Sequence, residues 1–202
     1  MLKESISQYI QEELKNQGAK SIKMFKEEKE LAQKHGLLPE GVSVEELSSV
    51  SRFYDAHIER GNKETDEVVA KETKDFLQQP ISYFKKQKNE FLYVESNWFE
   101  SVRADAISFE VDDAFGTYDV MLGLKFQKKF ASIIREQLRK QLAEEESPFD
   151  LMFNGEDGLW DFNFALNHIP GFQEEMTIGE AYSLIYAFLF ELVENVEGMA
   201  ER

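Results

Sequence analysis

The fold is decided by residues 118–126, where large apolar side chains occupy every second position: Tyr118-Asp119-Val120-Met121-Leu122-Gly123-Leu124-Lys125-Phe126. The same alternation occurs at 107–111 and again at 160–166, which reads Trp160-Asp161-Phe162-Asn163-Phe164-Ala165-Leu166. A period of two is typical of a strand with one buried face, and such strands favour antiparallel pairing. The second half of the chain is therefore predicted to form a mostly antiparallel sheet.

A hairpin is predicted at residues 149–167. Phe149–Phe153 and Leu159–Leu166 flank a five-residue connection that is rich in turn formers, Asn154-Gly155-Glu156-Asp157-Gly158. The alternation predicts that Trp160, Phe162 and Phe164 are buried and that Asp161 and Asn163 lie on the other face. Residues 91–94 are a candidate for one more strand.

Two helices complete the predicted second half. Apolar residues recur at helical spacing over 130–142, and Thr177 with Glu180 forms a capping box that begins a last helix at 178–196. This last helix contains seven consecutive apolar residues, Leu184 to Phe190, which leave it no polar face. We expect it to be covered either by N-terminal helices of the same chain or by a second copy, so the protein is a monomer or a homodimer.

The first 88 residues are predicted to be helical. Apolar residues at helical spacing predict helices from Ile6 to Gly18 and from Ile22 to His35-Gly36. Ser43 with Glu46 resembles a capping box ahead of a stripe that reaches Ile58, and a further helix is expected at 62–79. The predicted fold class is α+β: N-terminal helices (1–88) packed on a sheet unit (89–202), together one cooperative domain.

Composition excludes several classes of protein. The 202 residues include no cysteine, which excludes disulfides, thiolate nucleophiles and cysteine-ligated metal sites. The first residues lack the layout of a secretory signal, and the longest apolar stretch, Ala181 to Phe190, is too short to span a membrane. We therefore expect a cytoplasmic protein.

Negative charge is concentrated in the second half. Residues 1–90 carry 15 Lys and Arg against 17 Asp and Glu, whereas residues 91–202 carry 8 against 22, within a total of −16. Such a field repels phosphate backbones and anionic lipid, so neither nucleic acid nor a membrane is an expected partner. The charge serves either solubility or an acidic face for a basic protein partner.

The sequence contains no recognisable catalytic signature. It has no phosphate-binding glycine loop, no nucleophile elbow and no zinc-protease motif, and its three histidines, His35, His57 and His168, are far apart. His57 is expected beside a helix stripe, and His168 in a loop that could reach a site at the sheet edge. Core packing accounts for the abundant aromatic residues, with a small apolar ligand pocket as the alternative.

Carboxylates are the strongest candidates for a site. If the strands pair as neighbours, Glu110, Asp119 and Asp161 all point to the face opposite the large apolar residues. At such positions they could bind a hard cation such as Mg²⁺ or Ca²⁺, or act as an acid/base pair. The alternative is a solvated sheet face whose carboxylates pair with lysine and arginine. No cofactor is expected.

Residues 89–99 and 152–162 are similar to short, uncharacterised proteins of Bacillus-type bacteria. Some proteins of this kind carry a branched-chain aminotransferase label, but the present chain is too short for that catalytic fold and offers neither a cofactor lysine in context nor a phosphate cup. The resemblance therefore implies a bacterial setting and assigns no site residue.

The function expected from the sequence is non-enzymatic binding or regulation. An immunity-type protein, whose acidity neutralises a basic toxin, is one form of this function. The alternative is an enzyme or small-molecule binder that uses Glu110, Asp119 and Asp161, with or without a divalent cation.

Overall fold

The computed structural model describes residues 2–17, 21–142 and 149–200. The chain divides into two compact units, Met1–Arg52 and Phe53–Arg202. The larger unit is an α+β fold with a seven-stranded antiparallel sheet, which confirms the predicted fold class and the antiparallel pairing.

The smaller unit combines two helices with two short parallel strands. Its elements are α1 (Leu2–Gln17), β1 (Ser21–Met24), α2 (Lys26–Lys34) and β2 (Ser43–Glu46), and β1 pairs with β2. Arg52, at the end of this unit, is almost fully buried and donates hydrogen bonds to Glu28 at 2.6 Å and Glu27 at 2.7 Å. The guanidinium also lies 4.0 Å from the ring centroid of Phe25. A buried charge needs such partners, because a single unpaired ion in the interior costs several kcal/mol.

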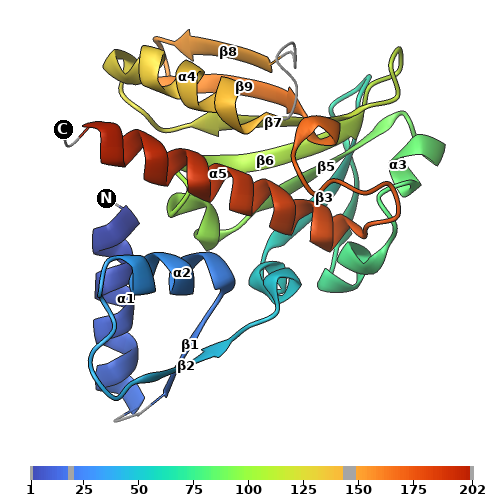
Figure 1. Cartoon of the computed structure of the whole chain (residues 1–202). Helices are drawn as coiled ribbons and strands as arrows, with labels where there is room; N and C mark the ends of the chain where they lie inside the picture. Colours follow the sequence, from blue (N-terminus) through green and yellow to red (C-terminus); the bar gives the residue numbers. More distant parts are fainter. Residues whose placement is uncertain (1, 18–20, 143–148, 201–202) are drawn as a thin grey trace. The chain divides into compact units, whose positions relative to one another are not determined.

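The seven strands of the larger unit lie in the order β4-β3-β5-β6-β7-β9-β8 (Figure 1). Their bounds are β3 (His57–Asn62), β4 (Val68–Glu72), β5 (Glu90–Glu95), β6 (Ala104–Val111), β7 (Tyr118–Leu124), β8 (Phe149–Asn154) and β9 (Leu159–Ala165). One row of directly paired residues crosses six strands, and every member of it is buried: Ile58, Val94, Ile107, Leu122, Phe162 and Leu151. Paired residues of a sheet share a face, so this row defines the buried face.

The buried face packs against helices. These are α3 (Tyr83–Lys86), α4 (Ala131–Gln141) and α5 (Ile178–Ala200), with α4 and α5 lying across the sheet in Figure 1. The hydroxyl of Tyr182 on α5 donates to the carbonyl of Ile107 at 3.1 Å, and the rings of Phe188 and Phe164 are 5.0 Å apart. The predicted capping box begins α5, since the Thr177 N–H donates to a Glu180 carboxylate oxygen at 2.7 Å.

The helical prediction for the N-terminal part is wrong beyond α2. Residues 43–46, expected to cap a helix, form β2, and the helix expected at 62–79 is replaced by β4 and a 3₁₀ turn at Lys74–Gln78. Residues 57–62 form β3, which pairs with both β4 and β5. Pairing with distant strands overrides a local helical stripe, and the β-branched Val68 and Val69 suit a strand. The helix predicted from Ile22 to His35-Gly36 is correct only over α2, because Ile22 and Met24 belong to β1.

The hairpin predicted at 149–167 is confirmed. Strands β8 and β9 pair directly, and Trp160, Phe162 and Phe164 are buried while Asp161 and Asn163 are exposed. The indole N–H of Trp160 donates to the carbonyl of Phe126 at 3.0 Å, which satisfies the ring's only polar group inside the core.

Trp160→Ala is expected to lower the free energy of unfolding by about 3–5 kcal/mol, because it leaves a cavity and an unpaired carbonyl. Urea denaturation followed by circular dichroism measures this change. Asn163→Ala, on the exposed face of the same strand, is the control and should change stability by no more than about 0.5 kcal/mol. A loss at Trp160 no larger than that of the control would contradict the assignment of the buried face.

Candidate functional site: the open face of the sheet

The second face of the sheet is the one that α3, α4 and α5 do not contact. A row of directly paired residues defines it: Lys71, Glu59, Tyr93, Ser108, Met121, Asn163 and Asp150. On six of the strands, the member of this row is next in sequence to a member of the buried row, and neighbouring residues of a strand point to opposite faces. On β4, Lys71 pairs directly with Glu59 and therefore shares its face. We call this surface the open face.

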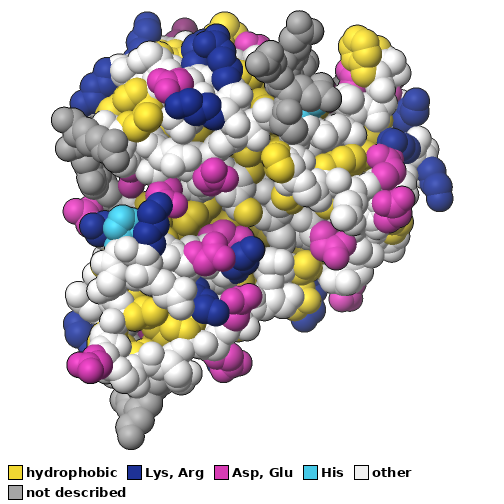
Figure 2. Space-filling model, in the orientation of Figure 1, with side chains coloured by type: hydrophobic (Ala, Val, Ile, Leu, Met, Phe, Trp, Pro, Cys, Tyr) yellow, Lys and Arg dark blue, Asp and Glu magenta, His cyan; other side chains and the backbone are white. Residues whose placement is uncertain are grey.

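The open face is strongly acidic. Seven carboxylates occupy it, against three lysines (Lys63, Lys71 and Lys125) and one histidine (His57); the seven are Glu59, Glu95, Asp105, Glu110, Asp119, Asp150 and Asp161. On the side covered by α4 and α5, by contrast, acidic and basic side chains are interspersed (Figure 2). Part of the negative charge of the second half of the chain is therefore concentrated on the open face.

The three carboxylates predicted as a site share this face but do not converge. Glu110 and Asp119 are direct partners on β6 and β7. Asp161 is opposite Gly123, four residues along β7 from Asp119, which corresponds to about 13 Å. The predicted trio is thus one adjacent pair and one separate carboxylate.

Glu110 already has a cationic partner. Lys63, from the turn between β3 and β4, lies 3.1 Å from a Glu110 carboxylate oxygen and donates to the carbonyl of Val111 at 2.7 Å. The Glu110 side chain is only 23% exposed, so this pair is partly screened from water. Within the described ranges, no group of three or more His, Asp or Glu side chains is arranged to hold a metal ion.

Asp119 carries an unfavourable charge. Burial raises the pKa of Asp119, and the nearby Asp112 carboxylate raises it further, while the Thr117 hydroxyl and Lys63 act in the opposite direction. The Thr117 hydroxyl donates to Asp119 at 3.1 Å. The ionised carboxylate is therefore less stable here than in water, and a cation bound beside it would be favoured.

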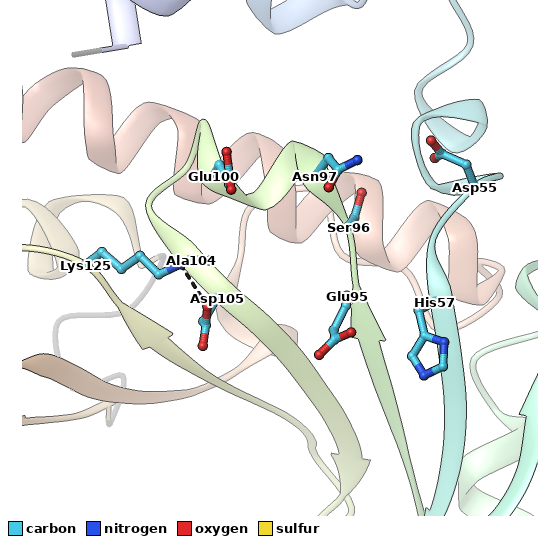
Figure 3. Close-up of a pocket in the computed structure, with 9 residues that line it drawn as sticks. All are labelled: Asp55, His57, Glu95, Ser96, Asn97, Glu100, Ala104, Asp105 and Lys125. Atoms are coloured by element: carbon cyan, nitrogen blue, oxygen red, sulfur yellow. Dashed lines mark ion pairs between the residues drawn. The ribbon is translucent and has the colours of Figure 1, made fainter. Parts of the chain in front are cut away.

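A hollow of about 330 Å³ lies at one end of the open face (Figure 3). We call it the acidic hollow, and its lining includes four carboxylates: Asp55, Glu95, Glu100 and Asp105. Lys125 pairs with Asp105 at 2.8 Å, and His57 lies in the same lining. Carboxylate oxygens in a shallow hollow accept hydrogen bonds from ammonium or guanidinium groups, so this end suits lysine or arginine side chains.

Tyr93 lies on the open face and contacts Glu95, which lines the acidic hollow. Its hydroxyl donates to Glu95 at 2.5 Å. Burial raises the pKa of Tyr93 to about 12, and Glu95, Asp105 and Glu59 add to the effect, so the phenol stays protonated. It acts as a hydrogen-bond donor that orients Glu95, and not as a base.

A second hollow, of about 590 Å³, lies at the other end of the strands. Five apolar residues line it (Phe115, Met121, Phe149, Phe164 and Ala165), together with polar residues that include Asp112, Asp119, Asp150 and His168. We call it the apolar hollow. His168, predicted to be a loop residue near a site at the sheet edge, lies at the end of a 3₁₀ turn (Leu166–His168) and in this lining.

Several of these residues were not found from the sequence. Glu95 follows the candidate strand at 91–94 directly, and extending its alternation by one residue would have placed Glu95 on the open face. His57 was assigned to a helix but begins β3, where it lies 2.9 Å from Glu59. Asp55 and Phe115 lie in turns and Glu100 ends a short 3₁₀ helix (Asn97–Glu100), where no periodicity indicates the direction of the side chain.

Comparison with known proteins adds no assignment. No protein-family model matches the chain, and no curated protein or solved structure is significantly similar to it. In the described part of the chain, no helix combines the length and apolarity that crossing a membrane requires.

Millimolar Ca²⁺ or Mg²⁺ is expected to leave the melting temperature unchanged relative to NaCl of equal ionic strength. The reason is that Glu110 is paired with Lys63 and Asp161 is distant, which leaves too few oxygen ligands together. Scanning calorimetry tests this expectation. A rise that saturates with cation concentration, and that disappears in Asp119→Asn or Asp161→Asn, would instead identify a metal site.

Asp119→Asn is expected to stabilise the protein at pH 7, by no more than about 1 kcal/mol. The native pKa is raised, so the native state keeps this proton at a higher pH than the unfolded chain does. Ionisation therefore destabilises the fold as pH rises between about 3.9 and the native value. The stabilisation should be greatest at pH 7 and shrink as pH falls through this window.

Urea denaturation at several pH values measures the effect, with the exposed Asp161→Asn as the matched control. The control should change stability by no more than about 0.5 kcal/mol at any pH. A destabilised Asp119→Asn would mean that the carboxylate makes a favourable contact instead.

Proposed function

We propose that this chain is a non-enzymatic binding protein whose open face receives a basic surface of a protein partner. The observation that carries the proposal is the imbalance of charge on that face: seven carboxylates against Lys63, Lys71, Lys125 and His57. Complementary charge both accelerates encounter and selects against acidic partners.

The distribution of the carboxylates favours binding over catalysis. An acid/base pair requires two groups that reach one substrate atom, whereas these carboxylates extend along the strands from Asp105 to Asp150. Glu110 and Asp119 are the only adjacent pair of the predicted trio, and Glu110 already forms an ion pair with Lys63. No specific observation favours an enzyme, so we propose no second function.

The energetics of the face also support a charged partner. Like charges directly opposite one another in a sheet, such as Glu110 and Asp119, destabilise it. Residues that lower stability in the free protein are common at binding surfaces, because the bound partner compensates them. An immunity-type role, in which this face covers a basic toxin in the bacterial cytoplasm, is one instance of the proposed function.

The test compares two variants that remove the same charge from opposite sides of the sheet. Asp105→Asn/Asp161→Asn neutralises two carboxylates of the open face, and Glu136→Gln/Glu191→Gln neutralises two exposed carboxylates on α4 and α5. Tagged wild-type protein captures partners from a lysate of the source organism, and mass spectrometry identifies them. Each partner is then purified and its Kd measured by titration calorimetry at two salt concentrations.

We expect a basic partner whose affinity falls about tenfold or more in the open-face variant and less than about twofold in the helix-side variant. Binding should also weaken as salt rises. An acidic partner, or equal losses in the two variants, would contradict the proposed function.

A further inference from the structure

The apolar hollow differs in kind from the rest of the open face. Apolar side chains form much of its lining, and three carboxylates, Asp112, Asp119 and Asp150, share that lining. Its volume of about 590 Å³ lies within the range of specific binding pockets. A pocket of this kind is suited to an apolar group whose surroundings are cationic.

Phe115 is held at the edge of this hollow by a well-defined turn. Its side chain is 86% exposed. A carboxylate oxygen of Asp112 accepts hydrogen bonds from the N–H groups of Ala114, at 2.8 Å, and Phe115, at 2.6 Å. Gly116 follows with φ of 68°, and its N–H donates to the Asp112 carbonyl. The turn thus presents a large apolar side chain to solvent, which is typical of a contact residue.

The charges around the hollow select the occupant. Lys63 is the cation that acts on Asp119, and it is also engaged by Glu110 and the Val111 carbonyl. The carboxylates in the lining would repel an anionic ligand and the acidic face of a second copy. A lysine or arginine placed beside Asp119 would instead stabilise its ionised form.

We propose that the apolar hollow receives a large apolar side chain, flanked by lysine or arginine, from the basic protein partner. This inference rests on the proposed function and identifies the partner's anchor. Asp119 and Met121 belong both to the hollow and to the open face, so the two are one continuous surface. Binding energy in protein interfaces concentrates in such anchors, while the charged rim excludes water and sets specificity.

The test uses two dye-labelled heptapeptides, each with three lysines on either side of a central residue, which is phenylalanine in one and alanine in the other. Fluorescence anisotropy gives the Kd of both for the full-length protein. We expect the phenylalanine peptide to bind about tenfold more tightly, or about 1.4 kcal/mol. A third peptide, with glutamates in place of the lysines around phenylalanine, should not bind.

Three single variants locate the preference. Phe115→Ser and Met121→Gln each remove an apolar side chain from the lining of the hollow. Because the peptide's phenylalanine then loses apolar contact, its advantage over alanine should fall to less than about twofold. Met152→Gln is the matched control, because Met152 is an exposed methionine paired with Asp161 on the open face and lies outside the hollow lining. It should keep the full preference. Circular dichroism verifies that every variant is folded.

The outcomes separate this inference from the proposed function. If both lysine peptides bind equally well, the proposal of an apolar anchor is wrong, whereas the proposal that the open face binds basic partners is retained. If neither peptide binds, both proposals fail. A preference that survives Phe115→Ser and Met121→Gln also overturns the anchor, as does binding of the glutamate peptide. Light scattering tests the rival occupant: a wild-type dimer that Phe115→Ser converts to a monomer would assign the hollow to a second copy.

Discussion

The packing of α5 against one face of the sheet determines which side chains of the larger unit point outward. Tyr182 and Phe188 hold α5 against Ile107 and Phe164. Because directly paired residues share a face, the same face is buried in all six strands of the row. A shift of one residue in any strand would exchange its apolar and acidic sets, so the register is strongly constrained. The acidic surface is therefore a direct consequence of how the core is built.

The same constraint creates a conflict on the open face. Side chains there cannot leave the sheet, and carboxylates at neighbouring positions repel one another. Lys63 and Lys125 relieve part of this repulsion through Glu110 and Asp105, but Asp119 has only the Thr117 hydroxyl at hydrogen-bonding distance among the described contacts. Solubility alone would be served equally well by charges spread over both sides. The basic partner proposed above would add cations beside these carboxylates.

The parts of the fold that the sequence predicted are those with a local signal. Alternation in β6, β7 and β9, the turn at Asn154–Gly158 and the capping box of α5 all depend on residues close in sequence. β3 has no such signal, because it buries only Ile58 and Gly61 and carries Arg60, whose charge is met by Glu72 and Glu90. The site followed the same rule: the shared face of Glu110, Asp119 and Asp161 was predictable, whereas both hollows depend on turns and distant strands.

The spacing of the two hollows limits what can bind. Asp119 lines one hollow and Lys125 the other, and six residues of an extended strand separate them, about 20 Å. A single basic side chain, or a free amino acid, cannot contact both. A helix would need about 13 residues to cover that distance, at 1.5 Å per residue, and it would have to present an apolar side chain at one end and basic ones towards the other. A partner that engages the whole face is therefore a helix of at least that length or a folded basic surface.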